Sequence, residues 1–428
     1  MSRTKKNWSE HGKPSFVELN NRAGFGQEQQ PGGIQHRENM SASDVKTEKH
    51  FVQIPMPGDH YSFCTGSAVM TLVYEFSRKH SDRGGETTVV VARGTRHDYP
   101  VGRCAEVEFG RFPPNWQRAL DAALGAAGLR RPFTNRFYAS AKTVIAPEFD
   151  GFVFLQNAPA PARSFKSHAP NARVVLHVHN SLFGTYSRRE IAATIAASDL
   201  VVCNCEFLAN EIDARLRGDR NPKIRVVYNG VDTRRFMPRP DLVDRETVSI
   251  LFVARMVPEK GADLLIKAGL KLYGGRRKFK LRIVGNQGFS ADGPLSPYEI
   301  ELRKLAAPMG DAVEFLPFVD RHKILPVYQS AGIFCAPSNW NEPCTLTIPE
   351  AMACGAPTVA SRIGGIPEMA GDAALFFDPP NIDQLAERLA YLIDDEKARQ
   401  EWSARARVRA EQCDWSHRYS DLRKALGI

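Results

Sequence analysis

The chain has 428 residues, more than one ordinary domain holds, so its length favours two domains. Hydrophobic residues make up 43% and charged residues 25%, as in globular proteins, and no run of about 18 apolar residues predicts a membrane-spanning helix. The net charge of +9 is modest for this length, and the N-terminus lacks the apolar core of a secretory signal, which favours the cytoplasm.

The N-terminal stretch is polar, with many Gly, Gln, Asn and Lys residues and little periodicity. Such a composition does not bury enough apolar surface to offset the entropy of folding. We therefore expect a disordered extension over 1–48, with Met40 as an alternative start of the chain.

Apolar, β-branched runs alternate with amphipathic stretches from Phe51 onward. Near-continuous apolar strands between helices are typical of a parallel sheet that is covered on both faces. We therefore expect an N-terminal Rossmann-like domain over 49–235. Its strands are expected at 51–55, 87–92, 151–156, 173–179, 199–204 and 224–230, and its clearest helices at 67–80 and 206–216.

A basic region lies inside this domain, between residues 93 and 142. It holds nine Lys and Arg residues against four acidic ones, a balance of +5. The region is either a solvated surface or one that attracts an anionic membrane face or a phosphate-bearing acceptor. It carries no nucleic-acid-binding motif, so we expect no nucleic acid as a partner.

The alternation restarts after a polar stretch, 236–247, that holds Pro238 and Pro240 and is expected to be a linker. A second Rossmann-like domain is expected over 248–411, followed by an amphipathic helix over 412–428. That last helix either crosses back to the N-terminal domain or packs on the second one. The strands of the second domain are expected at 248–255, 279–285, 312–318, 332–338, 356–361 and 374–377, and its clearest helices at 261–273 and 382–394.

Two doubly wound α/β domains of this kind bind ligands at the carboxyl ends of their strands, in the cleft between them. Two glutamates, Glu342 and Glu350, follow one such strand in the sequence NEPCTLTIPEAMACG (341–355). Glu350 has a purely structural alternative, a capping box with Thr347 at the start of a helix. A pair of glycosidase carboxylates is a second alternative, but nothing else in the chain indicates a hydrolase.

The segment APSNWNEPCTLTIPEAMACGAPTVASRIGGIPE resembles the Glu-x7-Glu signature of retaining GT-B glycosyltransferases of the GT4, or group 1, family. Its last five residues, 364–368, are one of the family's segments, and three further segments resemble the family in the same order: 226–232, 252–268 and 283–288. The resemblance implies a GT-B fold, in which two Rossmann-like domains face a central cleft. It further implies that the N-terminal domain (49–235) binds the acceptor and the C-terminal domain (248–411) binds the nucleotide sugar. It also implies transfer of a hexosyl group from a UDP- or GDP-sugar to a hydroxyl acceptor, in bacterial polysaccharide, lipopolysaccharide or glycoconjugate biosynthesis.

By the same resemblance, Arg255 and Lys260 grip the diphosphate of the donor. Glu350 binds the ribose hydroxyls, and Glu342 lies beside the donor sugar. The departing diphosphate is an anion, and positive charge near it stabilises the transition state. We expect Thr345 and Leu346, at the start of the helix that carries Glu350, to add backbone N–H groups to the donor site.

Two loops are expected to complete the site. Gly285 follows a strand and would let the backbone approach the nucleotide. Gly66, within Thr65–Ser67, resembles the family's phosphate loop, although the frequent second glycine is missing. Of two histidines on one strand, His177 and His179, the second lies nearer the strand's end, and we expect it beside the reaction centre.

The family resemblance implies no catalytic metal and no cofactor beyond the nucleotide sugar, and the sequence has no Asp-x-Asp motif. Rival functions are another GT-B activity, such as a sugar-nucleotide epimerase or a phosphorylase, and an inactive nucleotide-sugar-binding regulator. The basic region favours an acceptor that is anionic or lipid-linked, and with it peripheral association with the inner face of the membrane.

Overall fold

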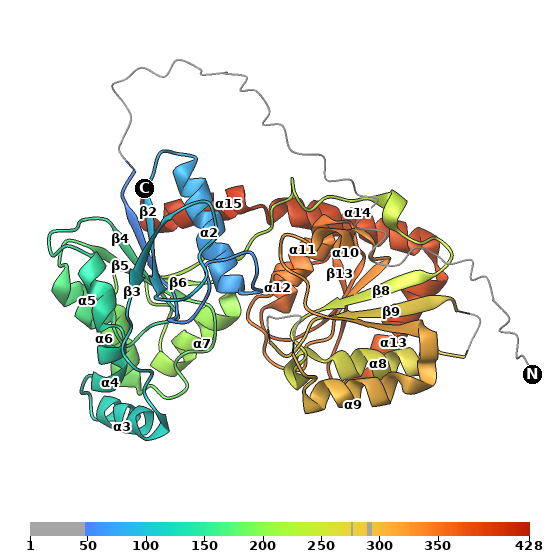
Figure 1. The fold of residues 1–428 in the computed structure, drawn as a ribbon, viewed down its shortest axis with the longest axis horizontal. Coiled ribbons are helices and arrows are strands. Elements are labelled where there is room, and N and C mark those ends of the chain that lie inside the picture. The colour runs from blue at the N-terminus through green and yellow to red at the C-terminus, as the bar shows by residue number, and fades with distance from the viewer. Residues whose placement is uncertain (1–47, 275–276, 289–292) are drawn as a thin grey trace, which may run out of the picture. The chain divides into compact units, whose positions relative to one another are not determined.

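The computed structural model describes residues 48–274, 277–288 and 293–428. The extension expected over 1–48, including Met40, lies outside these residues except for Glu48. The described chain forms two parallel sheets, each with helices on both faces (Figure 1). The predicted α/β fold with two Rossmann-like units is therefore confirmed.

The first sheet has seven parallel strands in the order β3-β2-β1-β4-β5-β6-β7. Each predicted strand of this half is present, but the sequence analysis missed β3, an edge strand whose side chains are mostly not buried and so give no apolar run. The strands are β1 (Phe51–Ile54), β2 (Thr87–Ala92), β3 (Arg103–Val107), β4 (Phe152–Gln156), β5 (Arg173–Val178), β6 (Leu200–Cys203) and β7 (Ile224–Val226).

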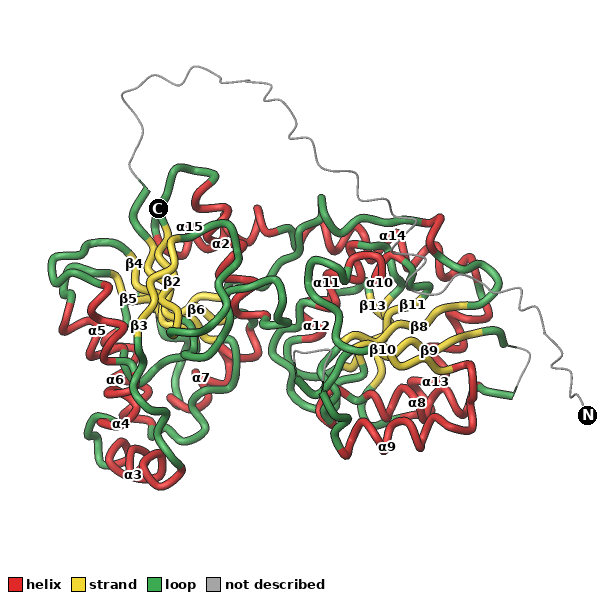
Figure 2. Tube along the Cα trace, in the orientation of Figure 1, coloured by secondary structure: helices red, strands yellow, loops and turns green. Residues whose placement is uncertain are grey.

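The second sheet has six parallel strands in the order β10-β9-β8-β11-β12-β13, and all six were predicted (Figure 2). The strands are β8 (Val248–Val253), β9 (Phe279–Val284), β10 (Val313–Leu316), β11 (Ile333–Ala336), β12 (Thr358–Ser361) and β13 (Ala374–Phe377).

Helices connect the strands, and the four clearest predicted ones are confirmed. The helices are α2 (Ala68–Ser81), α3 (Asn115–Ala126), α4 (Pro132–Phe137), α5 (Ala162–His168), α6 (Arg188–Ala197), α7 (Glu206–Leu216), α8 (Ala262–Leu272), α9 (Pro297–Ala306), α10 (Leu325–Gln329), α11 (Thr347–Ala353), α12 (Ile366–Ala370), α13 (Ile382–Asp394), α14 (Glu396–Gln412) and α15 (Trp415–Leu426). No helix in these described ranges is both long and apolar enough to cross a membrane.

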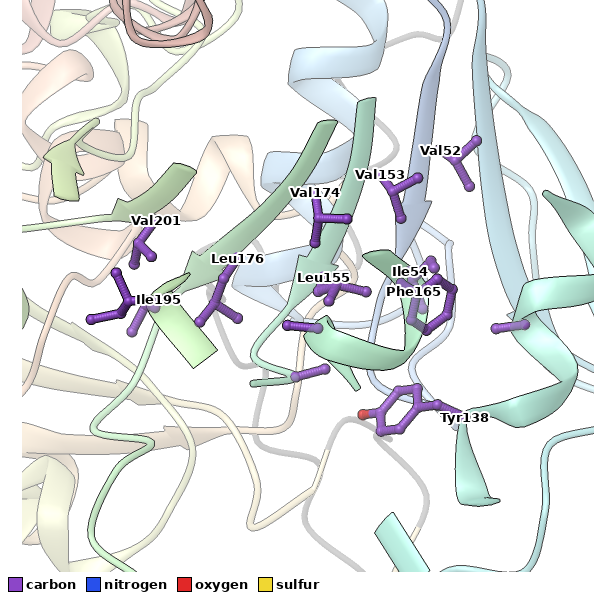
Figure 3. Close-up of a cluster of buried hydrophobic side chains, with 14 of the residues drawn as sticks. Val52, Ile54, Tyr138, Val153, Leu155, Phe165, Val174, Leu176, Ile195 and Val201 are labelled. Atoms are coloured by element: carbon purple, nitrogen blue, oxygen red, sulfur yellow. The ribbon is translucent and has the colours of Figure 1, made fainter. Parts of the chain in front are cut away.

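Burial of the strand side chains on both faces holds the first sheet in place. Val153 and Leu155 of β4 pack beside Val174 of β5 and against Phe165 of α5, as Figure 3 shows. Every side chain of β4 is buried, which explains the unbroken apolar run in the sequence. Such burial stabilises the fold by roughly 25 cal/mol per Å² of apolar surface removed from water.

The strand order reverses at β1 in the first sheet and at β8 in the second. In each sheet the first strand along the chain therefore has neighbours whose connections leave in opposite directions. Such switch points open a crevice at the carboxyl ends of the strands. The loops after β1, β4, β5, β8 and β11 should therefore carry ligand-binding residues.

The last helix packs on the N-terminal half. In α15, the Tyr419 hydroxyl lies 2.7 Å from Nδ1 of His80 in α2, and Trp415 is fully buried in one apolar cluster with Phe51 and Phe76. Phe236, at the predicted start of the linker, is buried among residues of the C-terminal half. The helix thus ties the end of the chain to the first sheet.

Candidate active site

A cavity of about 560 Å³ lies between the carboxyl edges of the two sheets. Both halves of the chain line it. All nine residues singled out from the sequence lie along this cavity: Gly66, His179, Arg255, Lys260, Gly285, Glu342, Thr345, Leu346 and Glu350. The structure therefore brings the whole predicted set together.

Arg255 reaches the cavity from the loop after β8. Its side chain is exposed, and its guanidinium has no hydrogen-bond or ion-pair partner within 48–274, 277–288 and 293–428. Beside it, Gly285 has a φ of 134°, and a Cβ there would lie 2.0 Å from the Ala254 carbonyl oxygen. Only glycine fits this close approach of the loops that follow β8 and β9. The unpaired Arg255 therefore lies beside backbone that carries no side chain.

Lys260 ends a short 3₁₀ turn, Pro258–Lys260, just before α8. Its Nζ forms an ion pair with Glu342 Oε2. The Trp340 indole N–H donates to the same oxygen, at 2.9 Å. The two residues expected on either side of the donor are thus already paired, so a donor phosphate would have to share or replace Glu342 as the partner of Lys260.

Glu350 lies in the first turns of α11, and its carboxylate is buried. That helix begins at Thr347, two residues later than expected, and Leu346 at its N-cap makes no side-chain cap. The alternative of a capping box with Thr347 is therefore wrong. Glu350 Oε1 instead accepts a 2.6 Å hydrogen bond from Arg321 Nη1.

Arg321 was missed by the sequence analysis, although it follows β10 just as Arg255 follows β8. Burial is the largest single influence and lowers the pKa of this guanidinium. The charge and hydrogen bond of Glu350, together with Tyr99 and Glu75, outweigh burial, so the pKa is raised. The Arg321 backbone N–H donates to the Phe63 carbonyl oxygen of the N-terminal half, at 3.1 Å. This residue thus joins the Glu350 carboxylate to the opposite side of the cavity.

The two histidines of the β5 segment differ in their surroundings. His177 is fully buried inside the strand and does not line the cavity, whereas His179 follows the strand and does. Burial lowers the pKa of His179 to about 3, so this imidazole is neutral at physiological pH. It cannot supply positive charge to a leaving group.

The tautomer of His179 follows from a buried chain of amides. Gln156 Nε2 donates to Gln53 Oε1 at 2.7 Å, which leaves Gln156 Oε1 as an acceptor 2.6 Å from His179 Nε2. In this arrangement His179 carries its proton on Nε2, and Nδ1 is left with a lone pair. Its chemistry is that of a fixed hydrogen-bond acceptor.

Four asparagines that the sequence analysis missed line the same wall. Each follows one of four successive parallel strands, β4 to β7, and this recurrence was a readable signal. They are Asn157, Asn180, Asn204 and Asn229. Asn157 has a positive φ of 54°, and its Oδ1 accepts from the backbone N–H of His179 at 2.8 Å. This wall is therefore built from amides.

The remaining predicted positions offer backbone rather than side chains. Gly66 is exposed in the loop before Ser67, the N-cap of α2. The Leu346 side chain is buried in the cluster that holds Trp415, so only its backbone faces the cavity. Thr345 Oγ1 accepts from the Thr347 backbone N–H at 3.3 Å and so fixes the start of α11.

One carboxylate links the two halves beside the cavity. The oxygens of Glu368, in α12, accept from the backbone N–H groups of Glu206 and Phe207 at 2.6 and 2.8 Å. These are the first residues of α7, whose N-cap Cys205 makes no side-chain cap. Glu368 therefore caps a helix of the other half and favours the closed arrangement of the cavity.

Comparison with known proteins bears on what this cavity binds. Residues 234–409 match the family model described as glycosyl transferases group 1, and residues 69–235 match the model of glycosyltransferase family 4. The spore coat protein SA of Bacillus subtilis (strain 168) is 28% identical over 277 residues, which is 60% of this chain and 73% of that protein.

Two further proteins carry a ligand in their names. A GDP-mannose-dependent monoacylated alpha-(1-6)-phosphatidylinositol monomannoside mannosyltransferase of Corynebacterium glutamicum is 30% identical over 213 residues, 46% of this chain but only 53% of that enzyme. Among solved structures, Anabaena Alr3699/HepE in complex with UDP and glucose aligns with a TM-score of 0.67. That alignment covers 89% of this chain and 100% of the Alr3699/HepE chain. At 18% identity it shows a shared fold and nothing more.

Proposed function

We propose, from the premise that this chain belongs to the retaining GT4 (group 1) family of glycosyltransferases, that it moves a hexosyl group from a UDP- or GDP-sugar to a hydroxyl acceptor. Nucleotide sugars are the donors of that family. The choice between UDP and GDP, the sugar and the acceptor are the proposed part.

The observation that carries the proposal is the unpaired Arg255 guanidinium beside the Lys260–Glu342 ion pair. An unpaired cation in a cavity of about 560 Å³ suits a diphosphate, which needs positive charge when it departs with the bonding electrons. Exchange of Glu342 for a phosphate oxygen would add Lys260 as a second cation. Glu350, held by Arg321, would accept hydrogen bonds from the ribose hydroxyls.

In the proposed reaction, the bond between the anomeric carbon and the β-phosphate oxygen breaks, and a bond from that carbon to the acceptor oxygen forms on the same face. The leaving phosphate oxygen takes the acceptor's proton. No protein nucleophile is needed, and the neutral His179 is suited to orient a sugar hydroxyl rather than to attack. Orientation and leaving-group stabilisation then supply the rate.

The first test is the melting temperature with UDP, GDP, ADP and TDP. A nucleotide at about 100 times its Kd stabilises the native state by about 2.7 kcal/mol, which gives a clear shift. We expect a shift with UDP or GDP and its loss in Arg255→Ala, whereas Arg245→Ala, an exposed cation away from the cavity, should keep it.

Incubation with the matching nucleotide hexose separates the rival functions. Release of the nucleoside diphosphate with an α-to-α or β-to-β linked product supports a retaining transferase. An epimerised nucleotide sugar would identify an epimerase instead. Binding without turnover on any acceptor offered would support the inactive regulator.

We also propose that the acceptor is lipid-linked or anionic and that the protein associates with the inner face of an anionic membrane. The relative from Corynebacterium glutamicum that is named for a phosphatidylinositol acceptor supports this. So does the basic region, where α3 exposes large apolar side chains beside arginines. Among them are Trp116 at 63% and Leu120 at 43% exposure, with Leu129 at 59% just beyond the helix.

Leu129 also borders a second cavity, of about 260 Å³, whose rim carries three exposed arginines, Arg130, Arg163 and Arg189. None of the three has an ion-pair partner in the part of the chain that the structure describes. Exposed cations beside apolar side chains suit the surface of an anionic bilayer, where each contributes about 1 kcal/mol.

Flotation with phosphatidylcholine vesicles, with and without phosphatidylglycerol, tests this membrane association. We expect binding only with the anionic lipid and its loss when all three rim arginines become alanine. The matched control replaces three exposed cations of the C-terminal half, Arg245, Lys278 and Lys397, by alanine. Equal flotation of the two triple variants would count against the basic rim.

A further inference from the structure

The N-terminal wall of the main cavity carries no cation. Of its lining residues within the described ranges, only Asp59 and His179 are ionisable. His179 is neutral at physiological pH, as argued above. Burial raises the pKa of Asp59, but no positive charge accompanies it on this wall. An anionic group entering here would meet a carboxyl group and no counter-ion.

The cations of the opposite wall are already committed. Arg321 pairs with Glu350, and Lys260 pairs with Glu342. Among the cations that line this wall in the described ranges, Arg255 alone is unpaired, and the proposed donor diphosphate requires it. Little positive charge is therefore left over for a phosphate on the acceptor.

In place of cations, the N-terminal wall offers uncommitted amides. Asn204 is only 2% exposed and lines the cavity, yet its side-chain amide has no hydrogen-bond partner among the described residues. Its Oδ1 is buried without a partner among these residues, which is unfavourable until a ligand donates a hydrogen bond to it. A rotation about χ2 would exchange this oxygen with Nδ2 and so bring either atom to the cavity.

Two neighbours extend the row. Asn157 uses its Oδ1 for the backbone of His179 and leaves its Nδ2 without a partner in the described structure. The Asn180 amide is exposed on the cavity side and makes no hydrogen bond within the described ranges. Amides both donate and accept hydrogen bonds, as hydroxyl groups do, and they carry no charge that would select an anionic ligand.

We propose that these three amides, Asn157, Asn180 and Asn204, bind the acceptor and that the part of it entering the cavity is a neutral, polyhydroxylated ring, such as a sugar or cyclic polyol. This inference rests on the proposed transferase function and names the acceptor class for its site. Any charge of the acceptor then lies outside the cavity, for example on a lipid carrier near the basic rim.

The test uses matched pairs of soluble acceptors with the donor found by thermal shift. Each pair is a methyl hexoside and the corresponding hexose 6-phosphate, with myo-inositol and inositol 1-phosphate as a further pair. Saturation-transfer NMR with the nucleoside diphosphate present measures binding even where no transfer occurs. We expect the neutral member of at least one pair to bind at least about tenfold more tightly than its phosphate ester.

Variants assign the effect to the amides. Asn204→Ala should raise the KM or Kd for the neutral acceptor about tenfold, the usual effect of a lost hydrogen bond, and leave the KM for the donor unchanged. Asn204→Asp should penalise the phosphate esters further. Gln400→Ala, which removes an exposed amide on α14, is the control and should change neither constant.

Two results overturn the inference: phosphate esters that bind as tightly as their neutral partners, or no binding of any neutral ring. These failures differ from failure of the proposed function. A protein that shows no nucleotide shift contradicts the transferase assignment, whereas one that shifts with a nucleotide but prefers phosphate esters contradicts only the acceptor class.

Discussion

The two walls of the active-site cavity use opposite kinds of polar group. The C-terminal wall holds three cations and two carboxylates, four of which are joined in the pairs Lys260–Glu342 and Arg321–Glu350. The N-terminal wall holds amides, a neutral imidazole and the carboxyl group of Asp59, but no cation among the described residues. Charge is thus concentrated where a diphosphate is expected, and hydrogen-bonding groups without charge are concentrated where hydroxyls are expected.

The difference also concerns how each wall responds to a ligand. Ion pairs on the C-terminal wall must be shared or exchanged when an anion enters, so donor binding should depend strongly on charge and on salt. On the N-terminal wall, the Gln53–Gln156 chain fixes the His179 imidazole, and the His179 backbone N–H fixes the Asn157 oxygen. That wall should therefore act through geometry.

The largest expected effect comes from removing the unpaired cation. Arg255→Ala should lower kcat/KM by about 10²–10³-fold, the usual effect of losing one group that stabilises developing charge. Since Arg255 is exposed and unpaired, the free energy of unfolding should stay within about 0.5 kcal/mol of the parent. Steady-state kinetics and urea unfolding measure the two quantities.

Arg245→Ala is the matched control, because it removes an exposed cation away from the cavity. A similar loss of activity in the control would point to long-range electrostatics. Full activity of Arg255→Ala would remove the main support for the donor site. Lys260→Ala is less clean, because it also leaves the buried Glu342 without its partner.

The sequence predicted the C-terminal wall better than the N-terminal one. The family signature covers the segments that hold Arg255, Lys260, Glu342 and Glu350. Charged residues that follow an apolar strand are also recognisable as candidate site residues. The four strand-end asparagines lack such a signature, and the role of Gln156 depends on Gln53, which is 103 positions away. Arg321 follows a predicted strand, as Arg255 does, so the same reasoning would have identified it as a candidate site residue.

Pairing is the feature that sequence could not give. The ion pair of Lys260 with Glu342 joins residues 82 positions apart and depends on how the loops after β8 and β11 fold. The edge strand β3 was missed because its side chains are half exposed. In both cases the structure depends on tertiary contacts that the sequence does not show. The fully buried strands, in contrast, can be predicted from their apolar composition alone.

The next effect sharpens the contrast by testing whether the His179 imidazole of the N-terminal wall is neutral. Since the pKa of His179 falls to about 3 in the folded protein, its contribution to stability is complete above the unfolded pKa of about 6.5 and is lost as pH falls toward 3. At about pH 5 the loss should be about 2 kcal/mol, because only the unfolded chain is then protonated at this residue.

Urea unfolding of the parent and of His179→Gln at about pH 7.5 and about pH 5 measures this loss. The difference between the two proteins should shrink by about 2 kcal/mol at the lower pH, because glutamine does not titrate. Buried His177 titrates in both proteins and cancels in the comparison. His417→Gln, at an exposed position, should show no such change. A constant difference would mean that His179 is protonated in the folded state.

A smaller effect is expected from the residue that fixes the His179 tautomer. Gln156→Leu removes the acceptor of the His179 Nε2–H, so the proton can move to Nδ1, and kcat should fall about tenfold with little change in donor KM. Gln53→Leu removes only the outer amide and should cost less. Equal losses in the two variants would indicate a packing defect rather than a tautomer effect.

The smallest expected effect concerns Glu368, one of the residues that join the two halves of the chain. Glu368→Ala removes the carboxylate that accepts from the Glu206 and Phe207 backbone N–H groups, and loss of such a helix cap costs about 1 kcal/mol. Because those N–H groups belong to the other half of the chain, loss of this cap should destabilise the closed form of the cavity. The stabilisation by the donor nucleotide should then shrink by up to about 1 kcal/mol.

Melting temperatures of this variant and of Glu387→Ala, measured with and without the nucleotide, show whether the cap stabilises α7 alone or the closed cavity. Glu387 is exposed on α13 and has no partner in the part of the chain described, so its loss should change neither value. If Glu368→Ala lowers the melting temperature equally with and without nucleotide, the cap stabilises α7 alone. If the loss is larger with nucleotide, the contact between Glu368 and α7 stabilises the closed, nucleotide-bound cavity.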